Sequence, residues 1–305
     1  MDAHDVVVIG GGFAGLSAAI YLARARRPVV VIDSGAPRNR FSSHSHGVFA
    51  LDGRSGHDLL TTARSQLLTY PSASVIDAVA RRVSPSGGDR GFGVEIEDGR
   101  PFEARRLILA TGLVDEVPEI PGIAERWGRS VFHCPYCDGY EVGGGPVGVI
   151  ATLPLSVHFA ELLADWGSVT LYTNGAIQPD ESERKRLAAR GVAVEDRPVA
   201  GLEGSPEGSL GFVRLVDGSR VEAKALFVAT RYRQAAPFAE QLGCALEENP
   251  RGLLVRTDES KMTSVRGVYA AGDMARATHS IPFATADGVT AGVAAHQSLV
   301  VEPRP

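Results

Sequence analysis

The chain has 305 residues, enough for two domains of ordinary size, and its 44% hydrophobic and 22% charged residues fit a globular protein. Its net charge is −5, and it carries no basic stripe and no basic amphipathic helix, so we expect neither nucleic acid nor a membrane as a partner. Three cysteines do not make a secreted disulfide framework, whereas one Cys-x-x-Cys pair fits a redox or metal pair.

The first predicted elements lie within residues 5–33. The apolar run Val6–Ile9 predicts a buried strand, a helix of small residues follows from about Ala14 to Arg26, and Val29–Ile32 predicts a second strand. The uncharged run Val6–Ala23 contains a glycine-rich turn and has no Lys or Arg before it, which favours a strand and helix over a signal or spanning segment. We therefore expect a cytoplasmic protein.

Between the first strand and the helix stands Gly10-x-Gly12-x-x-Gly15, which has the spacing of a dinucleotide-binding fingerprint. Gly10 makes the turn, Gly12 lets a pyrophosphate approach the helix N-terminus, and Gly15 permits tight packing of helix on strand. Asp33 ends the second strand and can accept hydrogen bonds from a ribose. The alternative is a glycine-rich turn without a ligand, but the strands, helix and acid stand in the order that binding requires.

Another buried strand, Arg105–Gly112, ends in Ala110, Thr111 and Gly112. The segment "VDEVPEIPG" after it, and "RYRQAAPFAEQLG" before Cys244, are both typical of linkers. We interpret them as the two crossings between a first domain, residues 1–113 and 241–305, and a second domain inserted into it, residues 114–240.

The inserted segment begins with "VFHCPYCDGYE", in which Cys134 and Cys137 stand three residues apart at a predicted helix start. Such a pair can close a disulfide, and the helix dipole favours the thiolate. A zinc site would need four ligands, and neither His133 nor Cys244 completes a zinc spacing, so we predict no metal. A c-type haem site would need His in place of Asp138. Two inert buried thiols are disfavoured by the polar surroundings, which leaves redox activity as the preferred interpretation.

Next comes "GPVGVIATLPLSVHFAELL". Val147–Ile150 predicts a strand and Val157–Leu163 a helix, yet the turn between them, Ala151–Ser156, contains no glycine. Its leucines bring side chains where a phosphate needs bare backbone, and Pro154 removes an N–H donor. After the next strand, Val169–Tyr172, the residues Thr-Asn-Gly supply neither a carboxylate nor an arginine. The later run 181–190 is typical of the solvated face of a helix.

Near the C-terminus, "GVYAAGDMARATHSIPFATADG" predicts a strand that ends in Gly272 and Asp273, followed by a helix that opens near Ile281 and Pro282. A Gly-Asp pair is also common in ordinary turns. Its place directly after an apolar strand favours a binding role.

Taken together, these motifs resemble a low-molecular-weight thioredoxin reductase across nearly the full length of the chain. Within that family the likeness is greater to the branch that reads Cys-Pro-x-Cys after a histidine, which includes the dithiol oxidases of gliotoxin, holomycin and romidepsin-type disulfide natural products. The resemblance implies two Rossmann-like, three-layer α/β domains, a homodimer and FAD as cofactor. It also implies that Cys137 faces the flavin, that Cys134 exchanges with substrate, and that Asp138 is the acid/base. His133 is an alternative base or a residue without a role.

The resemblance further implies which residues bind FAD. The helix that opens near Ile281 would point its dipole at the flavin and stabilise negative charge on the reduced ring. The loop from Arg38 through His46 would run past the flavin. The predicted cofactor contacts are Gly10, Gly12, Ala14, Gly15, Asp33, Arg40, His46, Val79, Ala110, Thr111, Gly112, Gly272, Asp273, Ile281 and Pro282.

The chain departs from that family in the inserted domain. Thioredoxin reductases bind NADPH there through a Gly-rich turn and a later arginine pair, and this sequence has neither; Arg231 also stands where the family has a glycine. We therefore predict an FAD-dependent oxidase that closes a disulfide in a small-molecule dithiol, with molecular oxygen as electron acceptor. Two alternatives stay open: a thioredoxin-type reductase fed by NADH, through a differently built weak site, by ferredoxin or by another donor, and an FAD-bound redox sensor. The sequence does not name the substrate.

Overall fold

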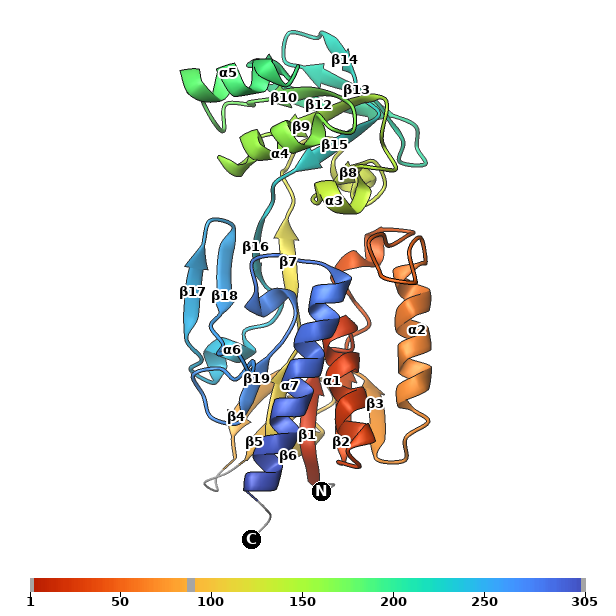
Figure 1. The fold of residues 1–305 in the computed structure, drawn as a ribbon, viewed down its shortest axis with the longest axis vertical. Coiled ribbons are helices and arrows are strands. Elements are labelled where there is room, and N and C mark those ends of the chain that lie inside the picture. The colour runs from red at the N-terminus through yellow and green to blue at the C-terminus, as the bar shows by residue number, and fades with distance from the viewer. Residues whose placement is uncertain (1–2, 87–90, 303–305) are drawn as a thin grey trace. The chain divides into compact units, whose positions relative to one another are not determined.

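The computed structural model describes residues 3–86 and 91–302, and the chain forms two compact units (Figure 1). The first comprises Met1–Arg40, Arg54–Val114 and Tyr232–Pro305, and the second comprises Phe41–Gly53 and Asp115–Arg231. The outermost residues of the predicted first domain, 1–2 and 303–305, lie outside the described residues. The units differ from the predicted domains in two places. Residues 41–53 belong to the second unit, and the chain returns to the first unit at 231–232 instead of near 241.

A seven-stranded sheet forms the centre of the first unit. Its order is β3-β2-β1-β6-β5-β4, with β19 also paired to β6. β1, β2, β3, β6 and β19 run parallel, while β4 and β5 continue from the first half of β6 as an antiparallel meander. The bounds are β1 (Ala3–Ile9), β2 (Val29–Asp33), β3 (Ala73–Asp77), β4 (Ala80–Pro85), β5 (Phe92–Ile96), β6 (Pro101–Leu109) and β19 (Val268–Ala270).

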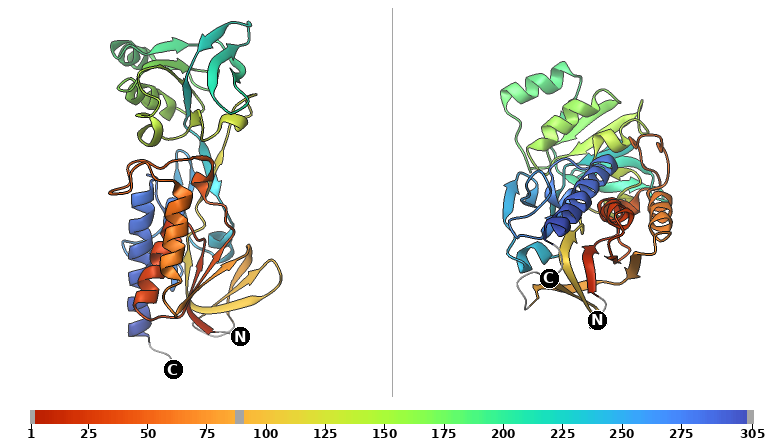
Figure 2. Two further views of the ribbon diagram at one scale, coloured as in Figure 1. Left: turned by 90° about the vertical axis from the view of Figure 1, so that its right-hand side faces the viewer. Right: turned by 60° about the horizontal axis from the view of Figure 1, so that its bottom comes forward.

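Three layers follow from alternation along these strands, because successive side chains of a strand point to opposite faces. In β1, Val6 and Val8 pack into the core beneath the helices, and Val7 and Ile9 pack into the core on the other face. The helices α1 (Phe13–Arg24), α2 (Gly56–Leu67) and α7 (Ile281–Val301) cover the first face (Figure 2). The other face is covered by the meander and by α6 (Phe238–Gln241), β17 (Leu246–Asn249) and β18 (Gly252–Val255).

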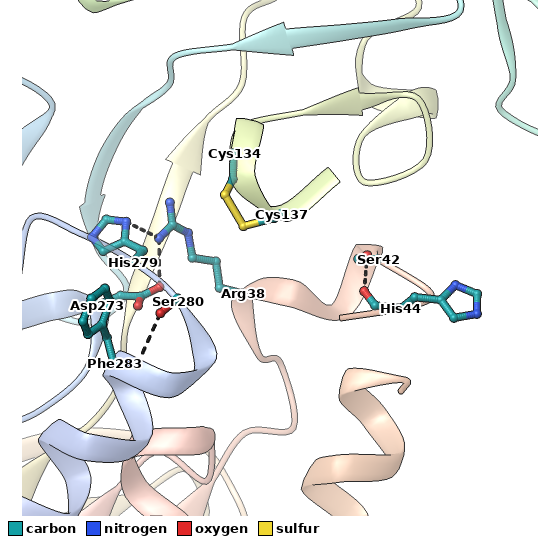
Figure 3. Close-up of a disulfide and its surroundings, with 9 residues drawn as sticks. All are labelled: Arg38, Ser42, His44, Cys134, Cys137, Asp273, His279, Ser280 and Phe283. Carbon is teal, nitrogen blue, oxygen red and sulfur yellow. Dashed lines mark hydrogen bonds and ion pairs between the residues drawn. A yellow bond between two sulfur atoms is a disulfide. The ribbon is translucent and has the colours of Figure 1, made fainter. Parts of the chain in front are cut away.

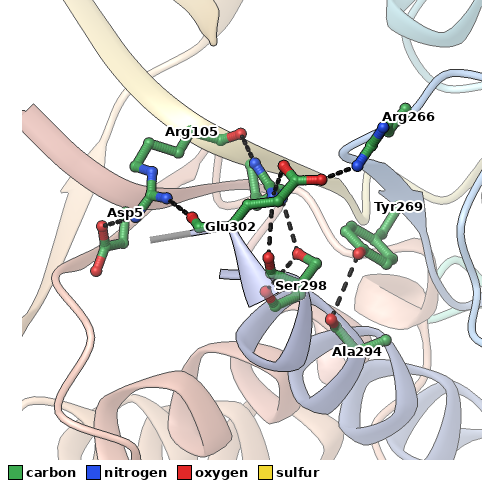
Figure 4. Close-up of polar contacts among 9 residues, drawn as sticks. Asp5, Arg105, Arg266, Tyr269, Ala294, Ser298 and Glu302 are labelled. Atoms are coloured by element: carbon green, nitrogen blue, oxygen red, sulfur yellow. Dashed lines mark hydrogen bonds and ion pairs between the residues drawn. The ribbon is translucent and has the colours of Figure 1, made fainter. Parts of the chain in front are cut away.

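Small residues let α7 lie directly on α1. A Cβ at Gly288 would overlap the carbonyl of Ala14, and one at Gly292 would stand 2.6 Å from the carbonyl oxygen of Ala18. Polar contacts fix the far end of α7 (Figure 4). Arg106, itself buried, donates to Glu302 Oε2 at 2.9 Å and to Ser298 Oγ at 2.7 Å. The helix that begins beside the predicted cofactor site is therefore packed closely on α1 and fixed at its far end.

The second unit contains an all-parallel sheet in the order β11-β10-β9-β15-β8 and a small antiparallel sheet, β12-β13-β14. Helices α4 and α5 pack on the parallel sheet (Figure 1). The bounds are β8 (Val131–Phe132), α3 (Pro135–Asp138), β9 (Pro146–Ile150), α4 (Leu155–Leu163), β10 (Ser168–Tyr172), α5 (Glu181–Ala189), β11 (Ala193–Glu195), β12 (Val199–Gly204), β13 (Leu210–Leu215), β14 (Arg220–Glu222) and β15 (Ala225–Val228).

The chain crosses between the units in β7 (Leu113–Glu116) and β16 (Arg231–Gln234), which pair as a two-stranded sheet. The remaining short elements are 3-10 turns: η1 (Arg38–Phe41), η2 (Ala124–Arg126) and η3 (Asp273–Ala275). The predicted fold class, two α/β units with one inserted in the other, is confirmed. Among the described residues, no helix combines the length and the apolar character of a membrane span.

Candidate functional site

The glycine-rich loop between β1 and α1 has the geometry of a phosphate seat. Gly10 has φ +105°, a conformation that favours glycine, and a Cβ there would overlap the carbonyl oxygen of Ala110 at the end of β6. A Cβ at Gly15 would overlap the carbonyl oxygen of Gly10. Gly12, directly before the helix, instead faces open space. Two glycines thus allow close packing within the protein, and the third leaves room for a ligand at the helix N-terminus.

Asp33 lies at the end of β2, beside the same loop. Its Oδ1 accepts a hydrogen bond from the backbone N–H of Gly11 at 2.9 Å, which fixes the carboxylate. Gly11 lacks a Cβ because one there would stand 2.6 Å from the Asp33 Cγ. The second carboxylate oxygen is then available to a ribose, as the sequence predicts.

Asp273 follows β19 and belongs to a cluster at the start of α7 (Figure 3). Arg38 Nη1 donates to Asp273 Oδ2 at 2.8 Å and lies 2.8 Å from Nδ1 of His279. Because a guanidinium only donates, His279 Nδ1 accepts and its Nε2–H donates to the Arg276 carbonyl at 2.9 Å. Burial lowers the pKa of His279, which keeps the ring neutral. Ser280 caps the helix by accepting from the Phe283 N–H at 3.3 Å.

The other predicted cofactor contacts lie at several places in the chain. Ala14, Gly272 and residues 110–112 gather at the carboxyl ends of β1, β6 and β19: a Cβ at Gly272 would lie 2.9 Å from that of Ala14. Ile281 and Pro282 form the first turn of α7. Val79 lies between β3 and β4, and its carbonyl accepts from the Glu97 N–H. Arg40 is exposed and donates to the Pro37 carbonyl, while His46 lies in the second unit.

In the second unit, a disulfide joins Cys134 and Cys137, with their Cα atoms 5.3 Å apart (Figure 3). Cys134 is the N-cap of α3 and Pro135 its first residue, a position where the missing proline N–H costs nothing. The third cysteine, Cys244, is buried in the first unit, and its Sγ donates to Thr263 Oγ1 at 3.4 Å. The sequence interpretation of one closable pair and one structural thiol fits this arrangement.

Asp138 directly follows the disulfide and is half-buried. Its pKa is raised to about 7, mainly by burial and also by the carboxylate of Glu141, while His46 acts in the opposite direction. A carboxyl group with that pKa can exchange protons near neutral pH. The alternative base, His133, is half-buried, with its ring stacked at 6.0 Å between centroids on Trp127.

The turn between β9 and α4 is held by hydrogen bonds among its own residues. The Thr152 N–H donates to Ser156 Oγ at 3.3 Å, and the Ser156 N–H donates to the Leu153 carbonyl at 2.9 Å. Leu153 is buried, and Thr152 Oγ1 donates at 2.6 Å to the carbonyl of Ala229, just after β15. In this sheet the strand order reverses between β9 and β15, which is where an open α/β sheet binds its ligand. Here a side chain of the protein bridges the two strand ends.

The end of β10 is likewise occupied by contacts within the protein. Tyr172 is fully buried, and its ring fills the space beside Gly148 of β9. Thr173 Oγ1 donates to Asp196, whose carboxylate also pairs with Arg184 at 3.1 Å. Asn174 accepts the N–H of Val199 at 2.9 Å. The residues that would meet a nucleotide ribose are thus engaged in structural bonds.

Sequence reasoning missed three features of these sites. The first is the contact of Arg38 with Asp273 and His279. Arg38 lies 235 positions before Asp273, and no local sequence pattern predicts their contact. The Thr152–Ser156 bond could have been suspected, since a serine four residues on can reach back to the turn. The third is the contact of His46 with Glu141 and Asp52; its place at the flavin stays a prediction.

Comparison with known proteins agrees with this geometry. A model of the family described as pyridine nucleotide-disulphide oxidoreductase matches residues 4–288. Thioredoxin reductase tcpT of Claviceps purpurea is 34% identical, covering 98% of this chain and 95% of its own. Thioredoxin reductase sirT of Leptosphaeria maculans is 33% identical, covering 94% and 92%. The crystal structure of an oxidoreductase from Agrobacterium tumefaciens matches with a TM-score of 0.94 at 43% identity, covering 99% of this chain and 100% of its own.

Proposed function

Because the chain belongs to the pyridine nucleotide-disulphide oxidoreductase family and is a disulfide oxidoreductase, we propose that it works as an FAD-dependent dithiol oxidase. Its substrate is a small-molecule dithiol of the disulfide natural-product kind, and molecular oxygen is the final electron acceptor. The observation that supports the proposal is the turn from Thr152 to Ser156, whose hydrogen bonds within the protein occupy the place where a nicotinamide nucleotide would need free backbone groups.

FAD is the cofactor of this family, and the first unit fits it. Gly12 leaves open space at the N-terminus of α1 for a pyrophosphate, and Asp33 presents a fixed carboxylate to a ribose. Asp273 and the first turn of α7 would hold the remainder of the molecule. When bound, FAD supplies a two-electron acceptor that oxygen can reoxidise to give hydrogen peroxide.

The chain's own residues perform the thiol chemistry. A substrate thiolate attacks Sγ of Cys134, the Cys134–Cys137 bond breaks, and Cys137 leaves as a thiolate. The second substrate thiolate then attacks the mixed disulfide and releases Cys134. The substrate leaves as a disulfide, and the protein pair is left with its two electrons. Asp138, with a pKa of about 7, takes a proton from the substrate.

A thioredoxin-type reductase is the second candidate, and the names of the relatives favour it, since both are called thioredoxin reductases. In such an enzyme the electrons run in the opposite direction, from a donor through the flavin to the protein disulfide. The first unit and the cysteine pair are compatible with both directions of electron flow. The feature that distinguishes the two functions is the turn from Thr152 to Ser156 in the second unit.

The test is an anaerobic titration of the purified flavoprotein. We expect dithiothreitol, as a probe dithiol, to bleach the flavin, and expect equal concentrations of NADPH or NADH to leave it oxidised. Admission of oxygen should restore the colour and yield one hydrogen peroxide for each dithiol oxidised. Rapid bleaching by NADPH or NADH, with no turnover of dithiol in air, would replace the oxidase with the reductase.

A further inference from the structure

The segment 41–53 is a closed loop in which backbone groups bond to one another and to Asp52. The Gly53 N–H donates to the Ser45 carbonyl at 3.0 Å, and the Leu51 N–H donates to that of Val48 at 2.9 Å. The Gly47 N–H donates to Asp52 Oδ1 at 2.7 Å. His46 is thereby set at a defined place on a loop that belongs to the same unit as the disulfide.

From this loop, His46 reaches the redox centre. Its Nδ1 lies 3.3 Å from Glu141 Oε1 and 3.6 Å from Asp52 Oδ2, so one imidazole stands between two carboxylates. Glu141 comes three residues after Asp138, in the turn where the Val142 N–H donates to the Asp138 carbonyl at 3.3 Å. Through Glu141, His46 therefore contacts the segment that carries the disulfide and Asp138.

Among the described residues, two charged groups act on Asp138: Glu141 from its own turn and His46 from the loop, with Asp52 behind His46. The tyrosines on the α3 segment, Tyr136 and Tyr140, are exposed, and the two cysteines are joined and do not titrate. Trp166, which packs on Gly139, carries no charge.

We propose that His46 is a positioning residue of the thiol–disulfide centre: by holding Glu141 against Asp52, it sets the pH range in which Asp138 takes a proton from a substrate thiol. The inference rests on the proposed function only in giving Asp138 the role of base. It assigns a role at the redox centre to a histidine that resemblance would place at the flavin.

The two partners of this contact are expected to act with opposite sign. His46 favours the Asp138 anion, so His46→Gln makes that anion less favourable and moves the acid limb of the rate profile to higher pH. Removing the negative charge of Glu141 does the reverse, so Glu141→Gln moves it to lower pH. Each shift should be roughly half a pH unit, the size of one partly screened interaction between charges.

The experiment measures the rate of anaerobic flavin bleaching by dithiothreitol from pH 5 to 9 in the holoenzyme. His46→Lys keeps a positive charge and should leave the acid limb at or below that of the parent. His44→Gln, on the same loop, is the matched control and should leave the profile unchanged. A ¹³C-carboxyl aspartate titration, assigned with Asp138→Asn, follows the same equilibrium without turnover.

The outcomes distinguish the role of His46 from the role of Asp138 as the base. Opposite shifts for His46→Gln and Glu141→Gln in both measurements support the inference. If the Asp138 resonance titrates identically in parent, His46→Gln and Glu141→Gln, the inference is wrong, whatever the enzyme oxidises. If the resonance shifts in opposite directions but Asp138→Asn bleaches as fast as the parent, His46 tunes a carboxyl group that is not the base, which overturns both the inference and the role given to Asp138.

Discussion

Arg38 donates to Asp273 at 2.8 Å, which joins a turn after β2 to the turn after β19. The same Nη1 lies 2.8 Å from His279, the residue before the cap of α7. Both charged side chains are mostly shielded, with 12% and 20% of their surfaces exposed, so solvent screens this pair less than a surface pair. The contact fixes a carboxylate of the predicted cofactor site through a residue that the fingerprint does not include.

We therefore expect Arg38→Met to loosen FAD. Asp273 would lose its partner, and hydrogen bonds to charged groups contribute about 1.5–3 kcal/mol each. The ratio of flavin to protein after gel filtration should fall, and the apparent Kd for FAD should rise by roughly tenfold or more. Arg100→Met is the matched control, because Arg100 is an exposed arginine that pairs with Asp98 in its own turn, away from the predicted cofactor contacts. Equal FAD retention in the two variants would remove Arg38 from the site.

Substitutions at the second and third glycines of the fingerprint, Gly12 and Gly15, are expected to fail in different ways. Gly12 faces open space, so Gly12→Val should fold and melt like the parent apoprotein while binding FAD poorly. Gly15→Val would drive side-chain atoms into the Gly10 carbonyl and should lower the free energy of unfolding itself by about 1–3 kcal/mol. Melting temperatures without FAD, together with FAD titrations, separate the two. Similar melting in both apoproteins would show that Gly15 is not a packing position.

The cysteines are expected to be indispensable for oxidation and dispensable for the cofactor. Cys137→Ser and Cys134→Ser each remove the disulfide that accepts the substrate's electrons, so both should lose dithiol oxidation. Because the glycine loop and Asp273, which we predict to bind FAD, lie in the first unit, both should purify with the flavin of the parent. Cys244→Ser, in the buried third cysteine, is the control and should keep activity. Full turnover by either variant of the pair would disprove its redox role.

Asp138→Asn should lower the rate of turnover and raise the stability of the folded protein at neutral and higher pH. Turnover should drop by roughly 10²–10⁴-fold near neutral pH, and the loss should shrink at high pH, where substrate thiols ionise without a base. His133→Gln, made in parallel, decides between the two candidate bases. If both variants match the parent throughout the pH range, neither side chain is the base.

The stability effect of Asp138→Asn has a defined sign. Folding raises the pKa of Asp138 from 3.8 to about 7, so the folded state binds the proton more tightly. The parent therefore loses stability as the pH rises from about 4 through about 7, by at most about 4 kcal/mol. The neutral asparagine avoids this loss. Its melting temperature should exceed that of the parent at pH 8 and converge with it toward pH 4, and an equal difference at both pH values would contradict the raised pKa.

How much of this could be predicted from the sequence depends on the range of each interaction. The loop from Gly10 to Gly15 and the pair Cys134–Cys137 were visible because their chemistry is encoded within a few consecutive residues. The partners of Asp273 and the contact of His46 with Glu141 join segments that are far apart in sequence, and no local pattern sets them. Residues 41–53 pack with the second unit although the chain on either side belongs to the first, which a linear division into domains cannot anticipate.

Nicotinamide nucleotides are expected neither to bind the second unit well nor to reduce the flavin. A pyrophosphate at α4 would have to break the Thr152–Ser156 bond, separate Thr152 from the Ala229 carbonyl and replace contacts of a buried leucine. Beyond β10, Asp196 is already paired with Arg184. Losing several charge-assisted hydrogen bonds, each worth about 1.5–3 kcal/mol, moves the Kd out of the useful range.

A melting scan with NADP⁺, NADPH or NADH measures this directly. A ligand present at about 100 times its Kd would stabilise the folded unit by about 2.7 kcal/mol, and we expect no such rise at millimolar concentrations. Ser156→Ala is the informative variant, because it frees the Thr152 N–H without adding bulk. It should still fail to bind, since Pro154 lacks an N–H and Thr152 still bridges to β15. Binding by the parent at micromolar NADPH, accompanied by bleaching of the flavin, would favour the reductase.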